Sequence, residues 1–247
     1  MKRVFVPAVL AATVLVAGCG KKNEAGAPPT APANSVPAVT APAGQDWTQT
    51  VSQTPEGGYV IGNPNATLKL VEYGSRLCPT CGAFAQAGMR PLIENYVKPG
   101  KVSYEFREYL VHGAPDFAPA LLGRCAGTQP FFPLLEEMFA AQPTILPKME
   151  DAGAFQQAQQ GKAPGVMFTA WAEKLGFIDF VKQRGIPEAQ ARACLTDEKQ
   201  IEALTKYMDA GTEKGVQGTP TFFLNGKKLD NVVTWDGVEG ALKNAGA

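Results

Sequence analysis

The chain has 247 residues, with 23 basic and 23 acidic side chains, one histidine and five cysteines. A body with no net charge and no run of Lys or Arg offers no electrostatic basis for binding nucleic acid. The part beyond the N-terminal segment, roughly 200 residues, is enough for one well-packed domain with an insertion, or for two small domains.

The N-terminus has the features of a secretory signal. A basic "MKR" precedes residues 4–18, which are nearly all apolar. This run spans roughly 22 Å as a helix, short of the ~30 Å hydrocarbon core, so we predict a signal peptide over residues 1–18. The segment "VAGC" resembles a bacterial lipobox and predicts lipidation of Cys19; an ordinary signal peptide is the alternative. Gly20 favours the outer membrane over the inner one.

A tether is expected next. The stretch "AGAPPTAPANSVPAVTAPA", residues 25–43, is mainly Ala and Pro and has no charged or aromatic residue. Such a segment buries too little apolar surface to offset its ordering entropy. We therefore assign residues 19–50 to the lipidated cysteine and a tether, and residues 51–247 to the folded domain. This places the domain at the periplasmic face of a membrane, where disulfides persist.

The folded part begins with a predicted strand–helix–strand unit. Residues 67–73 form an apolar strand, and a helical pattern follows Cys78, with a kink expected at Pro91. The segment "KVSYEFREYL" alternates and reads as a second strand. This is a βαβ unit with a cysteine pair at the start of its helix.

Helices dominate the middle of the chain. Residues from about 113 to 215 show mostly helical spacing of apolar side chains. Two short strands are then predicted around the turn at Asn225–Gly226, and a last helix over residues 235–244. The fold class is therefore α/β.

The motif "CPTC" carries the chemistry. Helix N-terminal N–H groups and the helix dipole stabilise a thiolate at Cys78 and lower its pKa. Cys81, one turn later, would be less exposed and act as the resolving thiol. A zinc site would need two more ligands. The candidates are His112 and two isolated cysteines, Cys125 and Cys194, which lie far apart in the sequence. We expect no metal, nucleotide or organic cofactor.

Two segments resemble the DsbA-type branch of the thioredoxin superfamily: "LVEYGSRLCPTCGAF" and, far downstream, "VQGTPTFFLNGK". The resemblance implies a thioredoxin fold with an inserted helical subdomain at about residues 113–215. It implies that Cys78 is the exposed nucleophile and Cys81 the buried cysteine. It also implies that Pro220 is a cis-proline facing the dithiol, and that the Thr219 backbone pairs with a substrate peptide.

The same resemblance assigns further residues. Glu72 matches a buried acid that helps to move the Cys81 proton; the alternative is an ordinary exposed strand residue. Pro79 and Thr80 lie between the cysteines and would contact substrate, but the His found there in strong oxidases is missing. Some family members carry a second, non-catalytic disulfide, which suggests a Cys125–Cys194 bridge; two buried free cysteines are the alternative. His112 is interpreted as a surface residue.

The predicted protein is an exported, monomeric thiol:disulfide oxidoreductase that forms disulfides in thiol-containing exported proteins. By family analogy, a quinone-linked membrane protein would reoxidise it. A reductase or isomerase with few clients remains an alternative, since Thr219 also occurs in those enzymes. A redox-inert peptide-binding or chaperone module is the alternative from another class.

Overall fold

The computed structural model describes residues 35–247. The predicted signal peptide over residues 1–18 and the predicted lipidation site Cys19 lie outside the described residues. Within the described part, no helix is both long enough and apolar enough to cross a bilayer.

A mixed sheet of six strands forms the centre of the domain, in the order β1-β2-β4-β3-β5-β6. Only β3 and β4 run parallel; every other neighbouring pair is antiparallel. The strands are β1 (Val51–Gln53), β2 (Tyr59–Gly62), β3 (Leu68–Gly74), β4 (Val102–Glu108), β5 (Thr221–Leu224) and β6 (Lys227–Lys228).

The parallel pair is joined by α1 (Pro79–Leu92), as the sequence predicts. Cys78 is the N-cap of α1, and a proline in the first turn fits because its missing N–H would have no partner there. Pro91 does not end the helix: the chain continues as a π-helix, η2 (Ile93–Val97). Helix irregularities of this kind are typical of prolines and π-turns.

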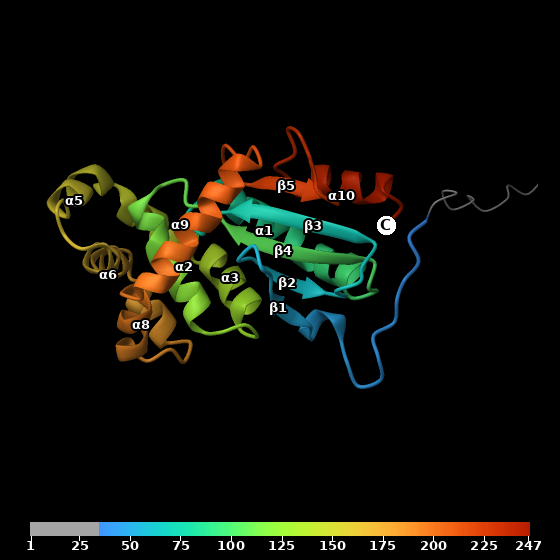
Figure 1. The fold of residues 1–247 in the computed structure, drawn as a ribbon, viewed down its shortest axis with the longest axis horizontal. Coiled ribbons are helices and arrows are strands. Elements are labelled where there is room, and N and C mark those ends of the chain that lie inside the picture. Colours follow the sequence, from blue (N-terminus) through green and yellow to red (C-terminus); the bar gives the residue numbers. More distant parts are fainter. Residues whose placement is uncertain (1–34) are drawn as a thin grey trace, which may run out of the picture. The chain divides into compact units, whose positions relative to one another are not determined.

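The predicted helical insertion is present between β4 and β5. In Figure 1 its helices gather at the end of the sheet to which the β3 and β4 arrows point, and α9 runs back across this region toward β5. The helices are α2 (Ala114–Cys125), α3 (Phe131–Ala140), α4 (Gln142–Ile145), α5 (Ala152–Ala158), α6 (Pro164–Leu175), α7 (Phe177–Lys182), α8 (Glu188–Leu195) and α9 (Glu198–Glu213).

Two apolar cores stabilise these parts. One lies between the sheet and the helices α1, α3 and α10 (Trp235–Asn244), and it contains Phe84, Tyr104 and Phe222. The other lies within the insertion and is centred on side chains such as Trp171. The last helix has the bounds that the sequence predicts.

The folded domain starts earlier than predicted. Residues 35–50, which the sequence assigns to the tether, pack onto the domain: the Val36 N–H donates to the Gly246 carbonyl at 2.7 Å, and Trp47 Nε1 donates to the Val39 carbonyl at 2.7 Å. Val36 and Trp47 are buried. The short strands β1 and β2 were also missed. The boundary at residue 51 is therefore wrong, because apolar side chains spaced among Pro and Ala residues find partners in the folded domain.

Candidate active site

The candidate site lies where β3 ends and α1 begins. Ser75, Arg76 and Leu77 form the connection, and Cys78 follows as the N-cap of α1. The Cys78 sulfur accepts a hydrogen bond from the Cys81 N–H at 3.3 Å. Both Cys78 and Cys81 are unbridged in this structure. The geometry is that of a sulfur held against the first turn of a helix, where an anion is favoured.

The surroundings of Cys78 favour its thiolate. The pKa of Cys78 is lowered to about 6, first because the Cys81 side chain makes a hydrogen bond to it. Burial opposes this effect, while a hydrogen bond with the Thr219 side chain and the N–H groups of Cys81 and Thr80 lower the pKa further. A large fraction of Cys78 is therefore ionised at neutral pH.

Cys81 has the opposite character. It is fully buried, and burial raises the pKa of its thiol well above the ordinary value. Its hydrogen bond to Cys78 and the negative charges of Glu72 and Cys78 raise the pKa further. The two cysteines of one motif thus differ strongly in acidity, and Cys81 remains a thiol where Cys78 is a thiolate.

The structure places Thr219 and Pro220 beside the cysteines, although they lie far apart in sequence. The Thr219–Pro220 peptide bond is cis, and the Cys78 thiol donates to the Thr219 carbonyl at 3.3 Å. Pro79 and Thr80 are exposed. Cys78 itself is only 6% exposed, which corrects the expectation of an exposed nucleophile: its sulfur contacts the Thr219 carbonyl and the Cys81 N–H.

Glu72 lies in the interior of β3 and is 1% exposed, so the alternative of an exposed strand residue is wrong. The Tyr104 hydroxyl donates to its Oε2 at 2.6 Å, and its Oε1 has no hydrogen-bond partner in the described part of the chain. Burial raises the pKa of Glu72 to about 8; the Tyr104 hydrogen bond lowers it and the Cys78 charge raises it. The carboxyl can therefore hold or release a proton near neutral pH.

Gln142, at the start of α4, is a site residue that sequence reasoning missed. Its buried amide nitrogen donates to the carbonyls of Arg76 and Cys78, at 3.0 and 2.9 Å. A Cβ at residue 82 would lie 2.0 Å from Gln142 Oε1, so a glycine is needed there to admit the amide. In the sequence, only the glycine directly after Cys81 points to this contact.

Other buried polar side chains also hold the connection between β3 and α1. Arg76 forms an ion pair with Glu108 at 2.8 Å, and both side chains are almost fully buried. Ser75 Oγ donates to Asp116 at 2.8 Å. Asp116 also lies 3.1 Å from Nδ1 of His112, whose side chain is 37% exposed. His112 therefore reaches the surface, as predicted, but is fixed by a buried carboxylate.

A groove of about 560 Å³ begins at Pro79. It runs between the exposed side of α1 and the helices α3 and α4, and its lining is largely apolar, including Met89, Phe139 and Leu146. Arg90 and Glu136 also line it. Pro79 and Gly82, next to the two cysteines in the chain, are among its lining residues.

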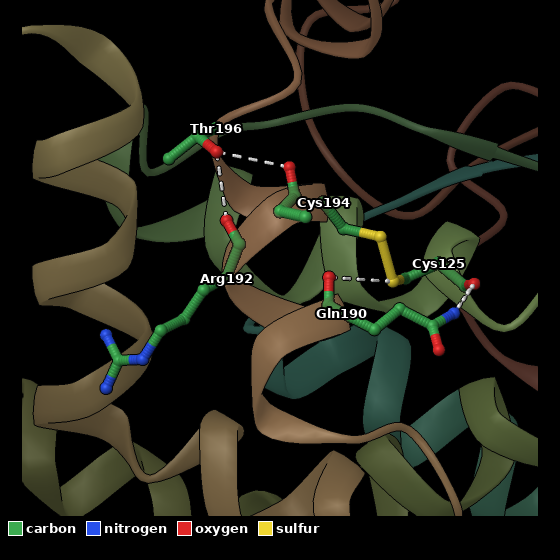
Figure 2. The surroundings of a disulfide bond; sticks show 6 residues. Cys125, Gln190, Arg192, Cys194 and Thr196 are labelled. Atoms are coloured by element: carbon green, nitrogen blue, oxygen red, sulfur yellow. Dashed lines mark hydrogen bonds between the residues drawn. A yellow bond between two sulfur atoms is a disulfide. The ribbon is translucent and has the colours of Figure 1, made fainter.

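Cys125 and Cys194 lie outside this site. The structure joins them in a disulfide between α2 and α8, across a sequence separation of 69 residues. Figure 2 shows the bridge with Gln190, whose amide donates to the Cys125 carbonyl at 3.3 Å. Among residues 35–247, no three His, Cys, Asp or Glu side chains are grouped to hold a metal ion.

Fold and site together define a class: a thioredoxin-fold protein with a cysteine pair at a helix start, a cis-proline after the residue whose carbonyl contacts Cys78, and a helical insertion. A family model described as thioredoxin matches residues 54–244. The chain belongs to this thioredoxin family.

Individual proteins agree with this assignment. A Rickettsia felis protein, provisionally named a protein-disulfide oxidoreductase, is 27% identical over 70% of this chain and 54% of its own length. The chain thus spans about half the length of that relative. Disulfide bond formation protein D of Bacillus subtilis is 22% identical, over 76% of this chain and 77% of that protein.

Solved structures show the same fold. A protein-disulfide isomerase from Novosphingobium aromaticivorans matches with a TM-score of 0.72 and 27% identity, covering 77% of this chain and 98% of that one. Oxidised BdbD from Bacillus subtilis matches with a TM-score of 0.57 and 21% identity, covering 75% and 91%.

Proposed function

We propose that the protein is an exported thiol:disulfide oxidoreductase that forms disulfides in client proteins. The observation that carries this proposal is the acidity difference within one motif: a Cys78 thiol with a pKa of about 6 beside a fully buried Cys81 thiol whose pKa is raised. A stabilised thiolate favours the reduced pair and makes its disulfide an oxidant.

The reaction would run in two exchanges. A client thiolate attacks the Cys78 sulfur of the Cys78–Cys81 disulfide; the S–S bond breaks, and Cys81 leaves as a thiolate that takes up a proton. A second client thiolate then attacks the client sulfur of the mixed disulfide, and Cys78 leaves as a thiolate. The client loses two electrons and two protons, and the enzyme pair gains the electrons.

The neighbouring residues have separate roles in this scheme. Glu72 would exchange the Cys81 proton, since its carboxyl is buried and its pKa is about 8. Thr219 and cis-Pro220 would hold the client backbone beside Cys78. Pro79 and Thr80, which are exposed, would touch the client, and the groove that begins at Pro79 would hold its apolar side chains.

The cellular setting is part of the proposal. Lipidation of Cys19 would hold the domain at the periplasmic face of a membrane, with the outer membrane favoured. A quinone-linked membrane protein would accept the electrons of the reduced pair. Both are inferred from the N-terminal sequence and from the family.

Two measurements test the function. The reduction potential of the Cys78–Cys81 pair is expected near the value of about −120 mV known for strong oxidases, and refolding of a reduced client should depend on Cys78. Cys78→Ser should abolish that activity, and Cys81→Ser should accumulate the mixed disulfide. A chaperone-like activity that Cys78→Ser retains in full would refute an oxidoreductase.

An isomerase or reductase is the second candidate. It is favoured by the absence of a His between the cysteines and by the similarity to the Novosphingobium protein-disulfide isomerase. A potential near about −270 mV, together with efficient insulin reduction, would select this candidate over the oxidase.

A further inference from the structure

Arg76 lies two residues before Cys78, in the connection between β3 and α1, and its side chain is fully buried. Its guanidinium group reaches the end of β4: Nη2 lies 2.8 Å from Glu108 Oε1, and Nε donates to the same oxygen at 2.9 Å. Nη1 donates to the Met138 sulfur of α3 at 3.3 Å. Arginine side chains are almost never fully buried unless they are paired, so the ion pair with Glu108 permits this placement.

Two helices of the insertion enclose this guanidinium. Its Cζ lies 5.0 Å from the centre of the Phe131 ring in α3, which is a cation–π contact. A Cβ at Gly123 of α2 would lie 2.3 Å from Cζ, so a glycine there leaves room for the charged group. The side chain of Arg76 therefore packs the loop before Cys78 into the helical insertion.

The backbone of Arg76 is held by a different element. Its carbonyl accepts a hydrogen bond from the Gln142 amide of α4 at 3.0 Å, and the same amide nitrogen donates to the Cys78 carbonyl at 2.9 Å. Arg76 is thus anchored twice, through its side chain to β4 and α3 and through its carbonyl to α4. These two anchors fix the peptide that leads into Cys78, whose sulfur lies 3.3 Å from the Cys81 N–H.

Stability alone does not account for the buried ion pair. Removing two charges from water costs free energy that their attraction only partly offsets, and well-packed apolar side chains of similar volume often stabilise such a site equally well or better. The pair is also incompletely bonded, because Glu108 Oε2 is buried and has no hydrogen-bond partner among residues 35–247. A guanidinium–carboxylate pair differs from apolar side chains in that its geometry is directional, so it favours one position of the loop.

We propose that Arg76, paired with Glu108, is a positioning residue of the active site: it fixes the loop so that the Cys78 sulfur lies against the first turn of α1. The inference depends on the proposed function and deepens it. A loop without this anchor would weaken the hydrogen bonds that favour the Cys78 thiolate, so Cys78 would be a poorer leaving group and its disulfide a weaker oxidant. Arg76 thereby acts through the backbone of the loop.

An apolar pair separates positioning from stability. Arg76→Met combined with Glu108→Leu removes both charges at similar volume, so we expect a folded protein whose midpoint of urea unfolding is close to that of wild type. The pKa of Cys78, followed by thiolate absorbance, is expected to rise by about half a unit to one unit, a three- to tenfold loss of acidity. A wild-type Cys78 pKa in the folded double variant would overturn the proposal.

A second ion pair of β4 provides the matched control. Nε of Arg107 lies 2.7 Å from a Glu105 oxygen, and both side chains are largely buried. By the alternation of a strand, this pair lies on the face of β4 opposite to Glu108. Arg107→Met combined with Glu105→Leu should leave the Cys78 pKa unchanged. An equal rise of the Cys78 pKa in both double variants would indicate a general loss of packing and refute the positioning role.

If the apolar double variant fails to fold, Arg76→Lys decides. Lysine keeps the charge opposite Glu108 but has one ammonium group in place of the guanidinium fork, so it cannot bind Glu108 and contact α3 at once. The Cys78 pKa should still rise, and a wild-type value would refute the role of Arg76. These titrations need no client, so they test Arg76 alone, whereas client oxidation that does not depend on Cys78 would refute the proposed function.

Discussion

Residues of one chemical type take different states in this site because their surroundings differ. Cys78 accepts hydrogen bonds at a helix start, whereas Cys81 is enclosed by apolar groups and faces the charge of Glu72. Glu72 in turn is far less acidic than an exposed carboxyl, since burial disfavours its charge. The acid–base roles of the site are thus set by burial and hydrogen bonding more than by residue type.

Replacing Glu72 should affect the Cys81 proton. In Glu72→Gln no carboxyl can exchange that proton, so the step in which Cys81 must ionise is expected to slow at least about tenfold, while Cys78 alkylation changes little. Stopped-flow resolution of a glutathione mixed disulfide measures the step. Tyr104→Phe is the matched control: it keeps the carboxyl, removes a hydrogen bond that lowers the pKa of Glu72, and should shift the pH profile upward. A wild-type pH profile of the resolution rate in Glu72→Gln would contradict the role of Glu72 in exchanging the Cys81 proton.

Cys78 should contribute stability to the reduced protein that increases with rising pH. Its folded-state pKa of about 6 lies below the 9.0 of a free thiol, so the unfolded chain binds more protons between these values. This stabilisation is present above pH 9 and is lost as pH falls through 6. Relative to Cys78→Ser, the free energy of unfolding should rise by about 2 kcal/mol across this range, after allowing for solvent screening. Urea unfolding of reduced samples measures it; parallel pH curves for the two proteins would contradict it.

At the scale of elements, three parts of the fold hold the loop from Ser75 to Cys78, which leads from β3 into α1. Gln142 of α4 donates to two of its carbonyls, Glu108 at the end of β4 pairs with Arg76, and Asp116 of α2 binds Ser75. Two of these contacts come from the helical insertion. The insertion therefore contributes to the position of Cys78 as well as to the walls of the groove.

Loss of the Gln142 contact should loosen that loop. Gln142→Leu leaves two buried carbonyls without a donor, and we expect the free energy of unfolding to fall by about 2 kcal/mol, with faster amide exchange over residues 76–81. Gly82→Ala should act in the same direction, because its Cβ would displace the Gln142 amide. Gln183→Leu, at an exposed position after α7, is the control. Unchanged amide exchange in both Gln142→Leu and Gly82→Ala would show that the loop is held without Gln142.

At the scale of the whole domain, the sheet core and the core of the insertion are separate clusters. The insertion core is closed by the Cys125–Cys194 disulfide, which links its first helix α2 to α8. The bridge lies apart from the dithiol site, so its contribution should be to stability only.

Removing the bridge tests this separation. Cys125→Ala with Cys194→Ala should lower the free energy of unfolding by about 4 kcal/mol, the chain-entropy value for a loop of this length. The pKa of Cys78 and the rate of disulfide exchange should stay at wild-type values. Chemical unfolding and thiolate titration measure the two quantities, and a shifted Cys78 pKa would show that the bridge and the active site are coupled.

The sequence alone predicted the parts that depend on local patterns. The apolar run around Leu70, the alternation around Tyr104, the cysteine pair at a helix start and the turn at Asn225–Gly226 predict strand, helix and hairpin in the right order. Two motifs placed the chain in its family. The short strands β1 and β2 escaped detection because three or four residues carry too little periodicity; β2 forms by pairing with β4, and β1 by pairing with β2.

Only the tertiary structure decided the chemical state of the site. The 6% exposure of Cys78, the buried carboxyl of Glu72 and the donors from Gln142 arise from contacts between segments that lie far apart in the chain. The same is true of His112, which looks like an isolated surface residue in the sequence but lies against the buried carboxylate of Asp116 that also binds Ser75. Acidity depends on the distance to charges and on exclusion of water, and these are fixed when the chain packs.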